Sequence, residues 1–306
     1  MKIKYLFIFV PIIFISCSKT EEETPISGQL NFICADDIAP IIKLQVEDFT
    51  RLYPKAKVNQ INTSARDAVV QLLNDSVEVI AIGRNFNPEE LEVIKKNNFV
   101  IDSVKIAYEA IVAIVNTSNK ISDIHVDDIK NILEGKKFSW SQIKGSKLQN
   151  KIVLALGDMN NGVNEYLRKR ILNNKKIESI TIKCNSTVDV ISAVQKYENA
   201  IGFVGLNSIT TKELNVKVLN VGDPNFYRDT VKKELEYFAP HQAHIYRNYY
   251  PLTRKIFILH NNVRYGVGVG FTTHVATNIG QHLFVKYSLV PAIMPVRLVQ
   301  LSNEEN

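Results

Sequence analysis

The chain of 306 residues contains only three cysteines, Cys17, Cys34 and Cys184. Cys34 and Cys184 lie in apolar, strand-like runs, which favours two buried free thiols, although a disulfide between them can form in an oxidising compartment. No block of Lys and Arg with interleaved aromatic residues is present, which argues against nucleic-acid binding. No Ser–His–Asp or metal-hydrolase pattern stands out, so an enzyme is the least favoured class.

Two short motifs lack the partners that a cofactor or metal would need. His241 and His244 place two imidazoles near each other, but no third ligand is evident, so no metal site is predicted. The glycine-rich run 265–270 has neither the Lys-Ser/Thr pair of a P-loop nor the spacing of a dinucleotide fingerprint. We interpret it as a flexible turn into the C-terminal helices, and we predict no cofactor.

The N-terminus has the pattern of a secretory signal. Lys2 and Lys4 precede an apolar run of 11 residues from Tyr5 to Ile15, and Ser16 and Cys17 follow. The run is too short to cross a bilayer, which takes about 20 apolar residues. The Ser16-Cys17 junction resembles a lipobox, in which Cys17 would carry a lipid.

We therefore predict a signal peptide over 1–16, a lipidated polar tether over 17–28 and a membrane-anchored protein of the periplasm or cell surface. The alternative is a plain cleaved signal in which Cys17 is incidental.

The remaining stretch of about 280 residues has an ordinary globular composition, with 45% hydrophobic and 22% charged residues. Its net charge of +6 suits an anionic ligand without requiring one. Strand and helix patterns alternate along the chain, which predicts an α/β fold with largely parallel sheets. The predicted strands are Gln29–Ala35, Lys57–Asn62, Val79–Gly83, Ala107–Asn116, Lys151–Leu156, Ile180–Cys184, Ala200–Val204 and Arg254–Leu259. The predicted helices are Pro40–Tyr53, Arg66–Leu73, one opening at Asn87-Pro88, Val163–Ile171, Val188–Lys196 and Ile279–Tyr287.

Several short segments, in the same order along the chain, are similar to those of the phosphate-binding subunits of ABC importers. The segments are Ile38-Ala39-Pro40, Tyr53-Pro54 with Lys57-Val58, Ile80-Ala81-Ile82-Gly83-Arg84, 110–119, 128–135, Phe138-Ser139-Trp140, Ala200-Ile201-Gly202-Phe203-Val204-Gly205 and Tyr250-Pro251-Leu252-Thr253-Arg254. Each motif is weak by itself, but together they run over nearly all of the chain after the tether.

The resemblance implies a two-lobed periplasmic binding protein of type II with two crossing hinge strands, Ala110–Asn116 and Arg254–Leu259. Lobe one would take 29–112 and 255–306, and lobe two would take 113–254. The ligand would be phosphate or a related small oxyanion, bound in the cleft between the lobes. The protein would be a monomer that delivers this ligand to ABC permease subunits.

Helix N-termini carry unpaired N–H groups that bind oxyanions, hydroxyls add donors and arginine offers a fixed fork. The resemblance places such groups on four loops. The candidate ligand-binding residues are Ala35, Asp36, Asp37, Thr63, Ser64, Arg66, Gly83, Arg84, Asn160, Asn161 and Gly162. Each has a plainer interpretation: the Asp and Ser residues can be helix caps, the arginines can be surface charges, and the asparagines can be turn residues.

The ligand loops depart from the family pattern. Asp36 and Asp37 stand where hydroxyl residues are usual, and Asn161 and Val163 flank Gly162 in place of Ser and Thr. Two desolvated, unpaired carboxylates would repel a dianion, whereas one can accept a proton-bearing oxygen. If both face the cleft, the ligand can be cationic, zwitterionic or neutral. Three hypotheses follow: an oxyanion receptor, a repurposed receptor with a changed ligand or a sensing role, and an enzyme.

Overall fold

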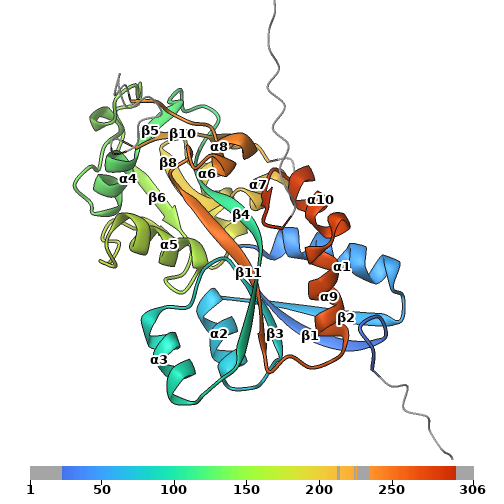
Figure 1. Cartoon of the computed structure of the whole chain (residues 1–306). Helices are drawn as coiled ribbons and strands as arrows, with labels where there is room; N and C mark the ends of the chain where they lie inside the picture. The colour runs from blue at the N-terminus through green and yellow to red at the C-terminus, as the bar shows by residue number, and fades with distance from the viewer. Residues whose placement is uncertain (1–22, 212–213, 224, 226–234, 294–306) are drawn as a thin grey trace, which may run out of the picture.

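The computed structural model describes residues 23–211, 214–223, 225 and 235–293. It shows an α/β protein of two lobes joined by two long strands (Figure 1), which confirms the predicted two-lobed fold class. The joining strands, β4 (Ile101–Val115) and β11 (Thr253–Asn261), are antiparallel and pair over most of their length. The predicted signal peptide 1–16 and the lipidation site Cys17 lie outside the described residues.

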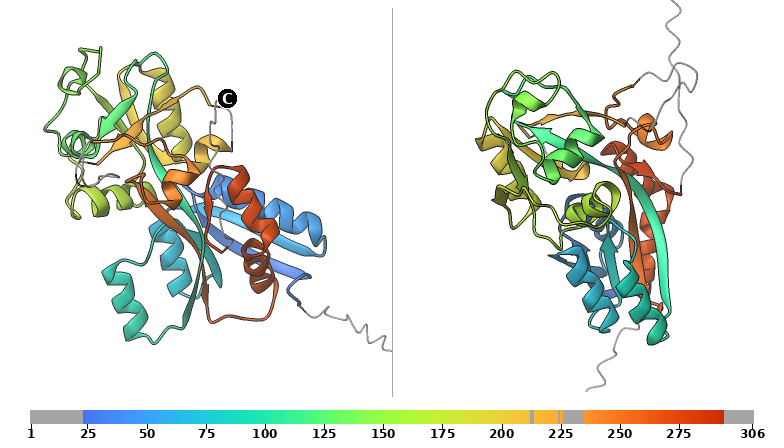
Figure 2. Two further views of the ribbon diagram at one scale, coloured as in Figure 1. Left: turned by 45° about the horizontal axis from the view of Figure 1, so that its top comes forward. Right: turned by 90° about the vertical axis from the view of Figure 1, so that its left-hand side faces the viewer.

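The first lobe is built from both ends of the chain. Its parallel strands come from the N-terminal third, and helices from the C-terminal part of the chain pack beside them (Figures 1 and 2). Its elements are β1 (Gly28–Ala35), α1 (Ala39–Leu52), β2 (Ala56–Thr63), α2 (Ala65–Leu73), β3 (Val79–Ile82), α3 (Pro88–Lys96), α9 (Val267–Ala276), α10 (Asn278–Lys286) and β12 (Val290–Pro291). Phe271 of α9 packs against Phe32 and Phe49, with ring centroids 5.3 and 5.7 Å apart, so α9 closes this core.

The second lobe has its own apolar core, centred on the fully buried Trp140, whose indole N–H donates to the Asn199 carbonyl at 2.8 Å. Its elements are β5 (Asp123–His125), α4 (Val126–Leu133), a short 3₁₀ helix (Trp140–Gln142), β6 (Val153–Leu156), α5 (Gly162–Ile171), β7 (Ile182–Lys183), α6 (Thr187–Lys196), β8 (Ala200–Gly205), α7 (Asn207–Thr210), β9 (Lys217–Val218), β10 (Asn220–Gly222) and α8 (Gln242–Tyr246). Each lobe buries a separate core. The lobes contact each other through loops, through the two joining strands and through α7 and α8, where Thr210 donates to the Tyr287 carbonyl and Gln242 donates to the Val285 and Leu289 carbonyls.

The strand pairing is mixed, so the prediction of largely parallel sheets is only partly right. Ten strands form one sheet whose main order is β2-β1-β3-β11-β4-β8-β6-β7. The pairs within β2-β1-β3 and within β8-β6-β7 are parallel. The strands β11 and β4 are antiparallel to each other; β11 is also antiparallel to β3, and β4 is also antiparallel to β8. The reason is that the two joining strands run between the lobes in opposite directions.

Local caps explain where the helices begin. Asn87 accepts from the Glu90 N–H while Glu90 accepts from the Asn87 N–H, a capping box that opens α3 as the Asn-Pro-Glu-Glu pattern predicts. Ser64 caps α2 through the Asp67 N–H, and Asn161 caps α5 through the Val163 N–H. The two last caps also fix the loops that face the junction of the lobes.

The glycine-rich run forms the start of α9, so its interpretation as a flexible turn is wrong. Gly268 and Gly270 are inside the helix and face neighbouring backbone and side chains. A Cβ on Gly270 would lie 1.7 Å from the carbonyl oxygen of Pro25. Gly270 is therefore required because Pro25 lies directly on this helix, and Gly268 leaves room for the side chains of Val79 and Glu78.

Cys34 and Cys184 are free and buried in the cores of different lobes, as predicted. Burial, and secondarily Asp37, raises the pKa of the Cys34 thiol, which disfavours the reactive thiolate. His241 caps α8 and the His244 Nδ1 lies 2.9 Å from the Ala239 carbonyl oxygen, so both imidazoles have local roles. In the described ranges, no helix is long and apolar enough to cross a membrane and no cluster of three or more metal-binding side chains occurs.

Candidate functional site

The loops that follow β1 and β3 in the first lobe meet the N-terminus of α5 in the second lobe. This junction brings together Asp36, Asp37, Gly83, Asn161 and Gly162 of the predicted residues. Ala35 is the buried last residue of β1, and Arg84 follows Gly83 at the rim. The predicted loops 35–37, 83–84 and 160–162 are thus neighbours in space, although they come from different lobes.

At the centre of the junction is a buried group of three charged side chains, Asp37, Glu109 and Arg254, which we call the interlobe ion cluster. Arg254 donates through Nη1 to Asp37 and through Nε and Nη2 to Glu109 Oε2, at 2.9 and 2.7 Å for the latter pair. All three side chains are at most 2% exposed. Burial alone would lower the pKa of Arg254, but the attraction of the two carboxylates outweighs it and raises that pKa.

Glu109 and Asp37 have one more partner in common, Asn207 of α7. Its side-chain amide donates to Glu109 Oε1 at 2.5 Å and to the Asp37 carbonyl oxygen at 3.0 Å. Its backbone N–H also donates to Glu109 Oε1, at 2.8 Å. Asn207 therefore helps to satisfy Glu109, whereas Oδ1 of Asp37 has no hydrogen-bond partner among the described residues.

Three glycines, one after β3, one at the start of α5 and one at the end of β8, leave the space that the interlobe ion cluster occupies. A Cβ on Gly83 would lie 2.7 Å from Arg254 Nη1, and one on Gly162 would lie 2.7 Å from Asp37 Oδ2. A Cβ on Gly205 would lie 2.6 Å from Glu109 Oε1 and 2.9 Å from Arg254 Nη2. Gly162 opens α5, so the Asp37 carboxylate lies at a helix N-terminus, where negative charge is favoured.

Gly205→Ala is therefore expected to lower the free energy of unfolding by about 1–3 kcal/mol, because the added methyl group has no room beside buried, ion-paired side chains. The measurement is equilibrium unfolding in denaturant. Gly157→Ala is the matched control, since its nearest neighbour would be Asn161 Cγ at 3.4 Å, an ordinary contact. Equal stability of the two variants would contradict this account of Gly205.

Asp36 joins the lobes by a hydrogen bond rather than an ion pair. Asn161 Nδ2 donates to its two carboxylate oxygens at 3.1 and 3.2 Å. Burial, and then the neighbouring Asp37, raises the pKa of Asp36 from 3.8 to about 6, although Asn161 lowers it in part. Both predicted carboxylates are thus engaged with partners at the junction, and Asp37 shares a charged partner that the sequence did not reveal.

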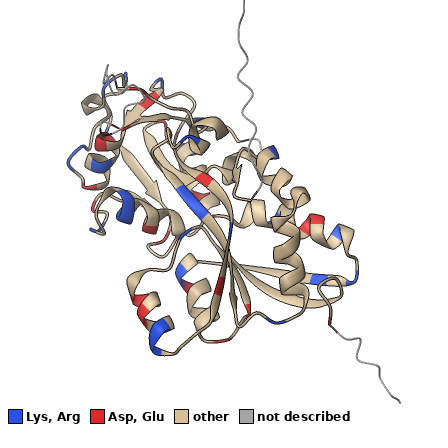
Figure 3. Ribbon diagram, viewed as in Figure 1, with Lys and Arg blue, Asp and Glu red and all other residues tan. Residues whose placement is uncertain are grey.

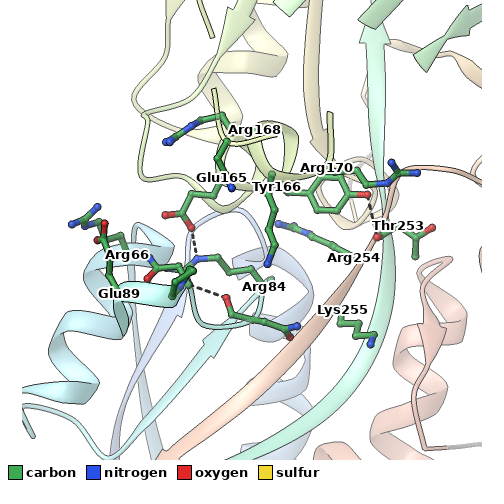
Figure 4. A pocket seen from close by; sticks show the side chains of 16 residues that line it. Arg66, Arg84, Glu89, Glu165, Tyr166, Arg168, Arg170, Thr253, Arg254 and Lys255 are labelled. Carbon is green, nitrogen blue, oxygen red and sulfur yellow. Dashed lines mark hydrogen bonds and ion pairs between the residues drawn. The ribbon is translucent and has the colours of Figure 1, made fainter. Parts of the chain in front are cut away.

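Arg84 forms the second ion-paired contact between lobes. It donates to both oxygens of Glu90 at 2.8 Å, and its Nε pairs with Glu165 of α5 (Figure 4). Burial alone would lower the pKa of Arg84, but Glu90 and Glu165 raise it, and burial raises the pKa of Glu165. A surface charge was the plainer interpretation of Arg84, but its side chain is only 10% exposed.

The remaining predicted residues are arranged more locally. Ser64 accepts from the Asp67 N–H at 3.1 Å and donates to Asp67 Oδ2 at 2.8 Å, so its hydroxyl is used within α2. Thr63 ends β2, and its carbonyl accepts from the Asp36 N–H. The Asn160 N–H donates to Asp158 Oδ1 at 2.8 Å, as expected of a turn residue.

A cavity of about 770 Å³ opens beside the interlobe ion cluster, between the lobes. We call it the basic cavity. Its lining residues come from α2, the loop after β3, the start of α3, α5 and β11 (Figure 4). They include seven cations, which are Arg66, Arg84, Arg168, Lys169, Arg170, Arg254 and Lys255. Only two carboxylates, Glu89 and Glu165, line it, so the cavity carries an excess of positive charge, and α5 and β11 show basic segments at the junction (Figure 3).

Of this lining, the sequence analysis predicted Arg66, Gly83 and Arg84. It did not predict the side chains of α5 and β11 that line the cavity. The signal for α5 was the run of three cations Arg168-Lys169-Arg170 within the predicted helix, which a solvated helix surface also produces. The signals for the interlobe ion cluster were Glu109, a charged residue within the predicted apolar strand Ala107–Asn116, and Arg254, the first residue of the predicted joining strand Arg254–Leu259. Their pairing across the register of β4 and β11 was not readable from the chain.

Comparison with known proteins agrees with this architecture. A family model described as a PBP superfamily domain matches residues 19–277. The phosphate-binding protein PstS of Staphylococcus aureus (strain USA300) is 22% identical over 225 residues, which are 73% of this chain and 65% of that protein. The chain therefore matches less than two thirds of the length of this relative.

Two solved structures share the fold. One is described as a phosphate ABC transporter substrate-binding protein with bound phosphate from Clostridium perfringens, with a TM-score of 0.73 and 17% identity, covering 87% of this chain and 100% of that one. The other is an ABC-type phosphate transport receptor from Vibrio cholerae, with a TM-score of 0.64, 17% identity and the same two coverages. At this identity the likeness establishes the two-lobed fold.

Proposed function

This chain belongs to the PBP superfamily, and from that premise we propose that it is an extracytoplasmic receptor for phosphate or a related small oxyanion. The observation that carries the proposal is the basic cavity between the two lobes. In this proposal the receptor captures the anion there and delivers it to the permease of an ABC importer. The names of the relatives in Staphylococcus aureus and Vibrio cholerae support this class of ligand.

The proposed capture step is closure of the lobes over the anion. The lobes would be 29–112 with 255–306 and 113–254, hinged at β4 and β11. Cations on both sides of the cavity favour closure when an anion is present, because Arg66 and Arg84 belong to one lobe and Arg168 to the other. Among the candidate residues, Arg66, Gly83 and Arg84 would face the ligand, while Asp36, Asp37, Asn161 and Gly162 would hold the closed junction.

The proposal is of a binding protein that needs no cofactor and performs no catalysis. The charged groups at the junction are held in ion pairs and amide hydrogen bonds, such as Arg84 with Glu90 and Arg254 with Asp37. These contacts stabilise the junction of the lobes and do not activate a nucleophile. We further propose that it acts as a monomer, as the resemblance to the phosphate-binding subunits of ABC importers implies.

Calorimetric titration of the purified protein with orthophosphate at several pH values tests the proposal. Saturable binding with a Kd of about 1 μM or tighter is expected. Arg84→Ala is expected to abolish it, because a cation of the cavity is lost and the carboxylate of Glu165, which Arg84 neutralises, then faces the anion unpaired. Arg51→Ala is the control, since Arg51 is an exposed residue of α1 that pairs with Asp48. Absence of heat and of a thermal shift at millimolar phosphate, arsenate and sulfate would contradict an oxyanion receptor.

Lipid attachment at Cys17 belongs to the same proposal, because a tether would keep the receptor near a membrane permease. Expression of the full chain in a bacterium fed an alkyne-tagged fatty acid is expected to label the protein. Cys17→Ser should abolish the label, while Cys34→Ser should retain it because Cys34 is buried. Label that persists in Cys17→Ser, or a processed protein without label, would favour the plain signal peptide.

A further inference from the structure

The place where a small anion would be expected is already filled by the protein. Helix N-termini and a buried arginine are the usual elements of an oxyanion site. Here the N-terminus of α5 at Gly162 and the Arg254 guanidinium both face the carboxylate of Asp37. An orthophosphate ion at this point would have to displace a buried carboxylate, so the ligand must be accommodated in the basic cavity beside it.

The cations of the basic cavity are more numerous than one small anion requires. Arg254 is compensated by Asp37 and Glu109, Arg84 by Glu90 and Glu165, and Arg170 lies 3.5 Å from Asp223. The cations that form no ion pair with any described carboxylate are Arg66, Arg168, Lys169 and Lys255.

These four uncompensated cations come from three separate elements. Arg66 lies on α2, Arg168 and Lys169 lie on α5, and Lys255 lies on β11. Figure 4 shows Arg66, Arg168 and Lys255 on different sides of the cavity rather than around one point. In addition, Nε of Arg168 is buried without a hydrogen-bond partner. Positive charge spread in this way is complementary to an anion whose charges are also spread.

The size of the basic cavity also favours an anion larger than one tetrahedral oxyanion. Its volume of about 770 Å³ is in the range of cavities that enclose drug-sized ligands, roughly 300–1,000 Å³, and is far larger than one tetrahedral oxyanion needs. The arginines offer two-pronged donors that match phosphoryl oxygens, and the lysines provide point charges for the remaining ones.

We propose that the basic cavity binds an oligophosphate, an anion with two or more linked phosphoryl groups, in preference to orthophosphate. The inference rests on the proposed receptor function and specifies its ligand class. Arg66 and Lys255 of one lobe and Arg168 and Lys169 of the other would contact different phosphoryl groups of one ligand. The ligand would thereby bridge the lobes and stabilise the closed arrangement.

Calorimetric titration of the purified protein with tripolyphosphate, orthophosphate and citrate tests the inference. Tripolyphosphate is expected to bind at least about tenfold more tightly than either of the others. The double variant Lys169→Glu/Lys255→Glu is expected to weaken tripolyphosphate binding by about tenfold or more, because both residues are uncompensated cations of the cavity. Lys120→Glu/Lys144→Glu, which reverses two exposed lysines outside the lining, is the matched control and should bind as the parent does.

The other outcomes separate this inference from the proposed function. Orthophosphate binding that equals or exceeds tripolyphosphate binding overturns the inference and leaves the oxyanion receptor standing. Citrate that binds as tightly as tripolyphosphate also overturns it, since recognition would then follow charge and not phosphoryl chemistry. Tripolyphosphate binding that is unchanged in the folded double variant excludes the basic cavity as the site. If none of the anions binds, both the inference and the proposed function fail.

Discussion

Arg254→Met is expected to lower the free energy of unfolding by about 3–5 kcal/mol, because it leaves two buried carboxylates without their cation. Asp37 and Glu109 are fully buried, and Arg254 is their shared charged partner. Methionine keeps much of the packing volume, so the loss is chiefly electrostatic. Equilibrium unfolding in denaturant, monitored by circular dichroism, measures the change.

Lys255→Met is the matched control for this variant. Lys255 is the next residue of β11, but its side chain is exposed, so its removal should change stability by less than about 0.5 kcal/mol. The triple variant Arg254→Met/Asp37→Asn/Glu109→Gln should regain most of the lost stability, since no unpaired charge is left. The triple variant tests the role of the interlobe ion cluster even if Arg254→Met does not fold. A loss below about 1 kcal/mol in Arg254→Met, or no recovery in the triple variant, would contradict the role of the interlobe ion cluster.

Asp36→Asn is expected to act in the opposite direction and to stabilise the protein above pH 6. The pKa of Asp36 is raised from 3.8 to about 6, so the folded protein holds the proton more tightly than the unfolded chain does. Stability therefore falls as pH rises from about 4 to about 6, by about 3 kcal/mol, and stays lower at higher pH. Asparagine is neutral at every pH and retains a carbonyl oxygen that accepts from Asn161.

The stability of Asp36→Asn and of the parent should therefore be measured as a function of pH from 4 to 8. The difference is expected to be near zero at the acid end and to grow to about 3 kcal/mol above pH 6. Glu92→Gln, which neutralises an exposed carboxylate of α3, is the control and should show a small difference at every pH. A difference for Asp36→Asn that does not change with pH would show that burial of its charge is not what limits stability.

Asp36 and Asp37 show how much of the site could be predicted from the sequence. It identified Asp36 and Asp37 as carboxylates at a helix entrance and left open whether one or both would repel an anion. The structure gives each a different partner, Asn161 for Asp36 and Arg254 for Asp37. The prediction could not distinguish them, because adjacent residues of a loop can face different neighbours and only packing decides which.

The interlobe ion cluster could not be predicted for a related reason. Glu109 was part of a run that was interpreted as an apolar strand, and Arg254 was part of a motif shared with a family. They are 145 residues apart in the chain, and Asp37 is 217 residues from Arg254. The antiparallel register of β4 and β11 places Glu109 opposite Arg254, and a shift of one residue would point them to opposite faces.

The sequence by itself determined the elements whose signals are local. The capping box at Asn87, the cap at Ser64 and the apolar run of β4 depend on neighbours within a few residues, so they could be predicted from the sequence. The two-lobed fold was predicted from the order of short motifs, through their similarity to the phosphate-binding subunits of ABC importers. Only the tertiary structure decided that Asp37 neutralises Arg254, that Arg84 joins the lobes through Glu165, and that basic residues of α2, α5 and β11 surround one cavity. The physical reason is that an ion pair depends on distance in space, which a folded chain sets between residues that its sequence keeps far apart.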